Sequence, residues 1–268
     1  MQTNRKLATI ASLLLSICLL TACGGRHEAS VIIAGSTSVQ RYIEILAEEY
    51  SAIHSGRVVD VQGGGSSAGI TAVESGTAAV GMSSRNLKES EEHLVVLEIA
   101  KDGLAIIVHP ENPLTNLTIE QIRGIYQGEL TSWTQLGGSS AEIHVVAREE
   151  GSGTRSAFEE MVMEGNRIKP KAIVLNSNGA VRQSIAADPN SIGFISLGLV
   201  EIGENPVKAL RIDSIEPTRE NVANGSYTLF RSFLFVMLEE PEGLVLQFIE
   251  FIQSQEGQKI LADEGLVT

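Results

Sequence analysis

The chain has 268 residues, of which 43% are hydrophobic, so it is long and apolar enough for one large or two modest domains with buried cores. Its formal charge of −13 makes nucleic acid and anionic membrane surfaces poor partners. Net charge acts at long range, however, and an acidic chain still binds an anion where helix dipoles and a local arginine act at short range.

Residues 1–22 have the pattern of a secretory signal. Arg5 and Lys6 precede the apolar run 13–20, and small residues follow it. The run is too short for a comfortable transmembrane helix. Loss of Arg5 and Lys6 with the signal would make the mature chain more negative still.

The segment Leu20-Thr21-Ala22-Cys23 resembles the bacterial lipobox. That resemblance implies cleavage before Cys23 and acylation of its thiol, so the mature protein would be anchored to the cell membrane without spanning it. Residues 23–30 would then be a lipidated tether. A plain cleaved signal with a stray thiol is the alternative. Cys18 leaves with the signal, so we expect no internal disulfide in the mature chain.

Several loops rich in glycine and hydroxyl side chains each follow a strand-like apolar run. They are 35–38, 63–69, 83–86 and 148–155. Ligands of open α/β sheets bind beyond the carboxyl ends of the strands, and glycines let an oxyanion approach the amides that begin a helix. Taken singly, each loop is better explained as an ordinary helix cap or turn. Together they predict an anion site built largely from neutral donors.

Arg148 supplies the charge of this predicted site. Its guanidinium is a rigid fork of donors, and Ser152 and Thr154 add hydroxyl groups in the same loop. We expect Glu150 to hold the guanidinium in place; the alternative is that Glu150 is simply an exposed glutamate.

Strands and helices alternate through the rest of the chain, which predicts α/β layers with mostly parallel sheets. The later expected strands are 94–99, 104–108, 143–147, 173–175, 192–195, 207–212 and 229–238. Of the later expected helices, one begins at a capping box at 118–121, and the others begin near 154, 179 and 241.

The anion loops fall into an early group and a late group, which predicts two lobes facing each other across a ligand cleft. We expect lobe I to contain residues 31–106 and 233–268, and lobe II to contain 107–232. Each lobe would have its own doubly wound sheet, and the extended runs near 104–109 and 226–234 would cross between them.

The ordered set of loops resembles the PstS-type phosphate-binding proteins of bacterial ABC phosphate importers, in their short lipoprotein form. The motifs at 34–38, 63–69, 81–85 and 148–154 match that family's ligand loops in order, and the likeness extends to 130–133 and 190–194. The resemblance implies a two-lobed type II binding-protein fold that closes around dehydrated inorganic phosphate. It also implies an extracytoplasmic monomer that delivers phosphate to ABC permease and ATPase subunits, with no cofactor and no metal.

The resemblance also implies which residues bind phosphate, through hydroxyl groups, helix N-terminal amides and one arginine. These residues are Thr37, Ser38, Ser66, Ser84, Arg148, Ser152, Gly153 and Thr154.

Ser84 departs from the pattern of longer family members, which have an aspartate here to accept the proton of phosphate and to repel sulfate. A serine hydroxyl both donates and accepts, so selectivity for phosphate over sulfate or molybdate is left open. A lipid-anchored binder or sensor of another tetrahedral oxyanion is therefore the alternative function. We expect Arg85 to brace this loop, and direct approach to the ligand is the other reading.

An enzyme with Ser152 or Ser66 as nucleophile is a weaker alternative. The chain's five histidines lie in no pairing with either serine that the sequence supports. The loop at 151–154 also lacks the Gly-x-Ser-x-Gly elbow. Metal chemistry is equally unsupported, because no His, Cys or Asp cluster has ligand spacing. We therefore expect a binding protein and no catalytic residue.

Overall fold

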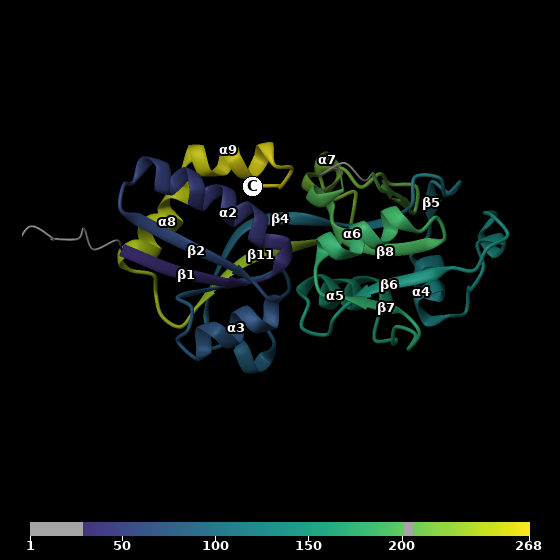
Figure 1. Cartoon of the computed structure of the whole chain (residues 1–268), viewed down its shortest axis with the longest axis horizontal. Coiled ribbons are helices and arrows are strands. Elements are labelled where there is room, and N and C mark those ends of the chain that lie inside the picture. The colour runs from purple at the N-terminus through teal and green to yellow at the C-terminus, as the bar shows by residue number, and fades with distance from the viewer. Residues whose placement is uncertain (1–28, 201–205) are drawn as a thin grey trace, which may run out of the picture.

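The computed structural model describes residues 29–200 and 206–268. Two lobes lie side by side along the long axis of the molecule, and strands β4 (Val95–Val108) and β11 (Phe230–Met237) run from one lobe toward the other (Figure 1). The two-lobed α/β architecture expected from the sequence is thus confirmed. The signal, Cys23 and most of the expected tether lie outside the described residues, and β1 already begins at Ala29.

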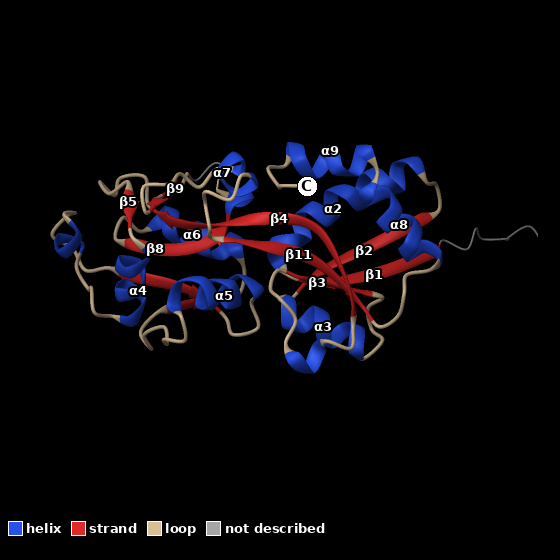
Figure 2. Ribbon diagram, turned by 180° about the vertical axis from the view of Figure 1, so that it is seen from behind, coloured by secondary structure: helices blue, strands red, loops and turns tan. Residues whose placement is uncertain are grey.

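The first lobe is built on the sheet order β2-β1-β3-β11-β4. Strand β1 pairs in parallel with β2 and β3, whereas β11 is antiparallel to β3 and β4. Helices α2, α8 and α9 lie on one side of this sheet and α3 on the other (Figure 2). The elements are β1 (Ala29–Gly35), α2 (Thr37–Ile53), β2 (Arg57–Gly63), α3 (Ser66–Glu74), β3 (Val80–Ser83), α8 (Gly243–Gln253) and α9 (Gln255–Asp263).

Helix α2 shows why the apolar spacing of the sequence produces this packing. Val39, Ile43, Leu46 and Tyr50 recur at helical spacing and are all buried. The ring of Tyr50 meets the ring of Phe248 of α8 edge-on, at 5.3 Å between centroids. The tail of the chain therefore packs into the first lobe's core, as the sequence predicts.

The second lobe is built on the order β4-β8-β6-β7, with β9 also pairing with β4. Its strands are β5 (Asn116–Leu117), β6 (His144–Arg148), β7 (Ile173–Leu175), β8 (Ser191–Ser196), β9 (Lys208–Ala209) and β10 (Arg211–Ile212). Its helices are α4 (Ile119–Gln127), α5 (Gly153–Phe158), α6 (Asn178–Ala187) and α7 (Arg219–Ala223). Helix α5 continues into the short π-helix η3 (Glu159–Met163).

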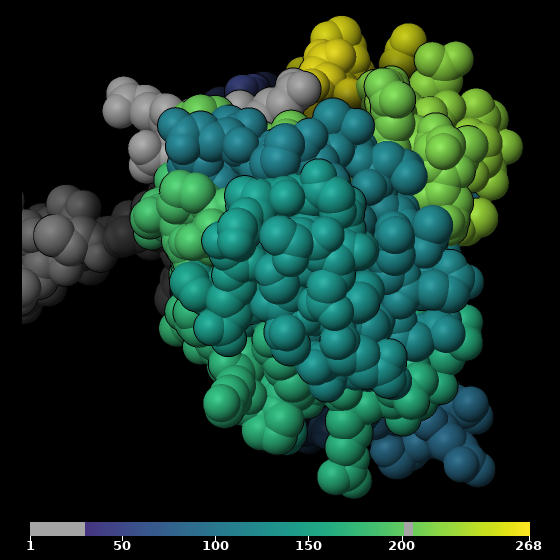
Figure 3. All heavy atoms as spheres, turned by 90° about the vertical axis from the view of Figure 1, so that its right-hand side faces the viewer, coloured from purple at the N-terminus to yellow at the C-terminus, as the bar shows by residue number. Residues whose placement is uncertain are grey.

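Strand β4 is buried on both faces in this lobe. Ile106 belongs to one apolar cluster with residues of α4 and α5, and Ile107 belongs to a second cluster with Val181 and Ile185 of α6. Alternate side chains of a strand point to opposite faces, so helices cover the sheet on both sides. Seen from its far end, the lobe presents a rounded surface formed largely by the segment between β4 and β6 (Figure 3).

Two of the expected strand boundaries are wrong. The runs 94–99 and 104–108 form the single strand β4, which pairs with β11 from Val95 to Gly103 and with β8 from Leu104 to Val108. The two expected sheets are therefore joined into one hydrogen-bonded path, because the charged residues between the runs interrupt the hydrophobicity but not the strand. The expected strand 207–212 is two short strands on either side of Leu210.

Among the described residues, no helix is long and apolar enough to cross a membrane.

Gly35 shapes the turn that leads from β1 to the first polar loop. Its φ is +142°, and its carbonyl oxygen accepts hydrogen bonds from the amides of Gly64 and Gly65 at 2.8 and 2.9 Å. A Cβ atom at Gly35 would lie 2.3 Å from the carbonyl oxygen of Met82. This position therefore requires glycine both for its conformation and for the close approach of β3.

We predict that Gly35→Ala lowers the free energy of unfolding by more than about 2 kcal/mol, because backbone strain and overpacking add. Gly56→Ala is the matched control, since Gly56 has φ +82° and a Cβ added there would meet nothing within 4 Å. It should cost only about 1 kcal/mol. Denaturant unfolding measures the free energy of unfolding of both variants. Equal losses of stability would contradict the special requirement for glycine at position 35.

Candidate anion-binding site

The polar loops of both lobes meet at the interface between them. Ser38, in the first turn of α2, and Thr154, in the first turn of α5, are both 1% exposed, and their hydroxyl oxygens lie 2.8 Å apart. The amide of Asn178 in α6 donates to the Ser38 hydroxyl at 2.9 Å. We call Ser38, Thr154 and Asn178 the interlobe cluster. These contacts join helix N-termini of opposite lobes, so the structure is in a closed arrangement.

A second group of hydroxyls, from the three loops of the first lobe, lies beside the interlobe cluster. Ser36 and Ser84 approach each other to 2.8 Å between Oγ atoms, and Ser66 and Ser84 to 3.4 Å. The backbone amide of Ser84 also donates to Ser66 Oγ at 3.1 Å. We call Ser36, Ser66 and Ser84 the serine triplet. All three side chains are buried, and these hydrogen bonds join hydroxyls and an amide without a carboxylate.

Gly153 brings the second lobe against this triplet. A Cβ at Gly153 would lie 2.2 Å from Ser66 Oγ and 2.5 Å from Ser84 Oγ. The amide of Ser67 donates to the carbonyl oxygen of Gly151 across the same boundary, at 3.2 Å. Glycine at 153 therefore allows the amide end of α5 to approach the first lobe's hydroxyls closely.

Arg148, at the end of β6, is 1% exposed and is held from several directions. Its Nε and Nη2 atoms donate to the Glu149 carboxylate at 3.0 and 2.8 Å. Nη2 also lies 3.3 Å from Thr37 Oγ1 in the first lobe. Nη1 has no hydrogen-bond partner among the described residues. A buried guanidinium with a free donor edge is typical of a site that receives an anion.

The expected partner of Arg148 is wrong by one residue. Glu150 is exposed and makes no described bond to Arg148, whereas the adjacent Glu149 pairs with it through two nitrogens. A turn follows Arg148, in which the amide of Ser152 bonds to the carbonyl oxygen of Glu149 at 3.1 Å. In this turn the Glu149 side chain faces Arg148 and Glu150 is exposed.

The predicted site residues are brought together with one qualification. Contacts connect Thr37 with Arg148, Ser38 with Thr154, and Ser66 with Ser84 and Gly153. Ser152 lies in the same loop, but its hydroxyl accepts the Arg155 amide at 3.2 Å and thus caps α5. For its side chain the helix-cap interpretation describes the structure, and its backbone amide bonds to the carbonyl oxygen of Glu149.

Sequence reasoning missed several polar residues of the site. Asn178 follows β7 in a polar turn that opens α6, which is the same pattern that revealed the other loops. Ser36 lies inside one of the recognised loops, although only Thr37 and Ser38, which follow it, were expected to bind. Asp102, Ser196 and Arg231 lie in strands, where no local pattern indicated a polar cluster.

Arg85 braces its loop, as expected. Its guanidinium donates to both carboxylate oxygens of Glu91, at 2.7 and 2.8 Å, and to the carbonyl oxygen of Asn86 at 2.8 Å. The hydrogen bond from Arg85 lowers the pKa of the Glu91 carboxyl below its ordinary value of 4.5. A charged pair thus fixes the loop that carries Ser84.

The described geometry gives no support to a serine nucleophile. Among the described histidines, His144 pairs with Asp188 at 2.6 Å and His93 lies 3.7 Å from Glu74. Within residues 29–200 and 206–268, no bond joins a histidine to Ser66 or Ser152, so these residues supply neither serine with a histidine base. Within the described residues no group of His, Cys, Asp or Glu has the arrangement of a metal site.

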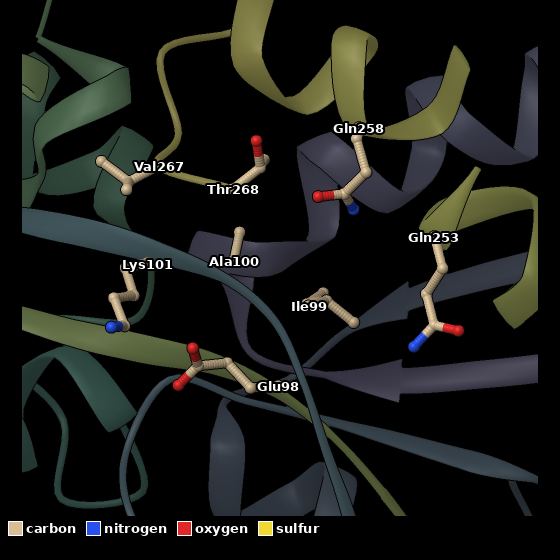
Figure 4. Close-up of a pocket in the computed structure, with 8 residues that line it drawn as sticks. All are labelled: Glu98, Ile99, Ala100, Lys101, Gln253, Gln258, Val267 and Thr268. Carbon is tan, nitrogen blue, oxygen red and sulfur yellow. The ribbon is translucent and has the colours of Figure 1, made fainter. Parts of the chain in front are cut away.

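A pocket of about 460 Å³ lies elsewhere, beneath the tail helices (Figure 4). Its wall includes β4 and the chain end, which are bridged by hydrogen bonds between Lys101 and Val267 at 2.7 and 3.0 Å. None of the anion-loop residues lines it, and it contains one acid and one base without a convergent set of donors. It is therefore not the anion site.

We predict that Gly153→Ala weakens phosphate binding by roughly 100-fold, equivalent to about 3 kcal/mol, because the added methyl group keeps the lobes apart. The protein should remain folded, since opening of the lobes relieves the overlap. Isothermal calorimetry measures the affinity and thermal unfolding the stability.

Gly151→Ala is the matched control, because a Cβ there would meet only Ser67 Cβ, at 3.8 Å. Equal phosphate affinities for the two variants would show that the lobes do not close on Gly153.

Comparison with known proteins agrees with this geometry. Residues 22–256 match the family model described as a PBP superfamily domain. The chain is 31% identical to the phosphate-binding protein PstS of Borreliella burgdorferi over 98% of each chain.

Solved structures give the same result. A putative phosphate ABC transporter substrate-binding protein from Clostridium perfringens, with bound phosphate, is 40% identical and has a TM-score of 0.85, covering 89% of this chain and 99% of that one. An ABC-type phosphate transport receptor from Vibrio cholerae is 39% identical, with a TM-score of 0.74 and the same coverage. The chain therefore belongs to the PBP superfamily and, within it, to the PstS-type proteins.

Proposed function

We propose that this protein binds inorganic phosphate outside the cytoplasm and delivers it to an ABC importer. The observation that carries the proposal is the interlobe cluster, in which hydroxyls from opposite lobes meet. Thr37 links this cluster to Arg148, a buried arginine with one nitrogen unpaired in the described part of the chain. Relatives that this chain matches over nearly their whole length are named as a phosphate-binding protein and a phosphate transport receptor. A phosphate ion between the lobes would replace the direct contact between Ser38 and Thr154.

The phosphate-binding groups we propose are hydroxyls, backbone amides at helix starts and the Arg148 guanidinium. They are Thr37, Ser38, Ser66, Ser84, Arg148, Ser152, Gly153 and Thr154. Hydrogen bonds to a charged partner contribute about 1.5–3 kcal/mol each, so a naive sum over the site would approach the practical affinity limit of roughly −18 to −21 kcal/mol. Anion desolvation and lobe closure must offset most of it, which leaves micromolar or tighter binding.

We propose lobe I as residues 31–106 and 233–268, and lobe II as residues 107–232. In support, one core cluster is drawn from residues within 31–100 and 233–266, and another from residues within 104–229. Leu104 and Ile106 belong to the second cluster, so their packing favours a boundary on β4 slightly before residue 106. The chain passes from one lobe to the other within β4 and again near β11, so hinge motion at these strands would open and close the site.

Binding of another tetrahedral oxyanion is the second candidate. The serine triplet supports it, because Ser84 brings a hydroxyl and not a carboxylate to the ligand loops. A hydroxyl donates equally well to sulfate, so the triplet supplies no group that repels an anion without a proton.

We predict that Arg148→Ala weakens phosphate binding by at least about 100-fold, because it removes the charged donor with a free edge. Glu150→Ala, which alters an exposed neighbour, should bind as the unmodified protein does. Calorimetry of a soluble form, residues 24–268, measures the affinities of both variants for phosphate, arsenate, sulfate and molybdate across a range of pH.

Equal effects of the two substitutions would show that the site is misplaced. Tighter binding of sulfate or molybdate than of phosphate would favour the second candidate. Ser84→Asp in the same series tests whether a carboxylate at this position adds discrimination in favour of a protonated anion.

We propose further that the mature protein is a monomer anchored to the cell membrane by acylation of Cys23. The lipobox-like sequence before that cysteine supports the anchor. In a bacterial host, Cys23→Ser should move the mature protein from the membrane fraction to the soluble fraction while its phosphate affinity is unchanged. An unchanged membrane fraction would contradict the anchor.

A further inference from the structure

A buried ion pair lies where β4 passes from one lobe's sheet to the other's. Asp102 of β4 and Arg231 of β11 are direct cross-strand partners, with 3.1 Å between Oδ2 and Nη2. Two residues later β4 has left β11, and Leu104 pairs with Ser196 of β8. Ser196 donates its hydroxyl hydrogen to the other Asp102 oxygen at 2.8 Å. The carboxylate is therefore bonded by strands of both lobes.

Arg231 extends this pair to the proposed ligand site. The same Nη2 atom that pairs with Asp102 lies 3.1 Å from Ser38 Oγ and donates to it. The Asn178 amide donates to Ser38 Oγ as well, at 2.9 Å. A hydroxyl oxygen has two lone pairs, and these two donors occupy them. The Ser38 proton is then directed away from both, toward Thr154 or toward an anion in its place.

Two guanidinium groups share this buried region. Arg231 is 6% exposed and Arg148 is 1% exposed. The pKa of Arg231 lies below its ordinary value, mainly because the side chain is buried. The negative charge of Asp102 raises this pKa, and the positive charge of Arg148 lowers it further. Nε and Nη1 of Arg231, like Nη1 of Arg148, have no hydrogen-bond partner among the described residues. Asp102 and Glu149 each neutralise one guanidinium, and an anion at the site would relieve the remaining repulsion between them.

We propose that Arg231, held by Asp102, is a positioning residue that fixes the Ser38 hydroxyl as a donor to the anion. This inference rests on the proposed phosphate site. It assigns to the crossing strands a role in ligand recognition in addition to their role as connections. A buried pair that served stability alone would need no third contact to a ligand-binding hydroxyl.

The experiment is a double-mutant cycle between Arg231→Gln and Ser38→Ala, measured by calorimetry with phosphate. Arg231→Gln alone should lower affinity by at least about tenfold, because a charged donor to the ligand site is lost. In the Ser38→Ala background the same substitution should cost less than about threefold, because the group it positions is already absent. Additive losses would overturn the positioning role.

Conservative and control variants separate this role from a structural one. Arg231→Lys keeps the charge and a donor, so it should retain more affinity than Arg231→Gln. Arg211→Gln, which removes an arginine from an exposed pair with Glu216, should leave affinity unchanged. If Arg231→Gln does not fold, the neutral double variant Asp102→Asn with Arg231→Gln removes the uncompensated buried charge and replaces it in the cycle.

Arg148→Ala in the same series separates a failure of the site from a failure of the role of Arg231. If it binds phosphate normally, the proposed site itself is wrong. If it loses binding while the folded Arg231 variants bind within about twofold of the unmodified protein, the site stands and the role of Arg231 is wrong.

Discussion

The contact between Ser38 and Thr154 across the lobe boundary is the interaction on which the site depends. Each hydroxyl stands in the first turn of a helix whose amides point toward the boundary, so an anion there meets dipoles from both lobes. Most of the donors are neutral. A chain of charge −13 thus holds an anion by local geometry, with arginine charges that carboxylates already balance.

The crossing strands make this geometry possible. Because β4 is shared by both sheets, the position of one lobe relative to the other is set at a few residues near Gly103 and Leu104. Asp102 and Arg231 lie at that changeover, and their bonds reach Ser38 in one lobe and Ser196 in the other. The hinge and the ligand site that we propose are therefore connected by a short chain of buried polar contacts.

Much of this structure could be predicted from local sequence pattern. Strand, glycine turn and capped helix recur at the early loops and at 148–155, and the structure brings those loops together. What could not be predicted depends on partners distant in sequence or on the course of a turn. Glu149 takes the place expected for Glu150 because a turn decides which carboxylate faces Arg148, and Asp102 meets Arg231 only through strand register. The sequence pattern also predicted two strands in place of β4, because the polar residues at the lobe boundary resemble a loop.

The most direct test of the central claim is a crystal structure of the protein with phosphate. We expect one tetrahedral anion between the lobes, within hydrogen-bond distance of Ser38, Thr154 and Arg148, with Arg231 still bonded to Ser38. An anion bound to one lobe alone, or bound away from these loops, would contradict that claim.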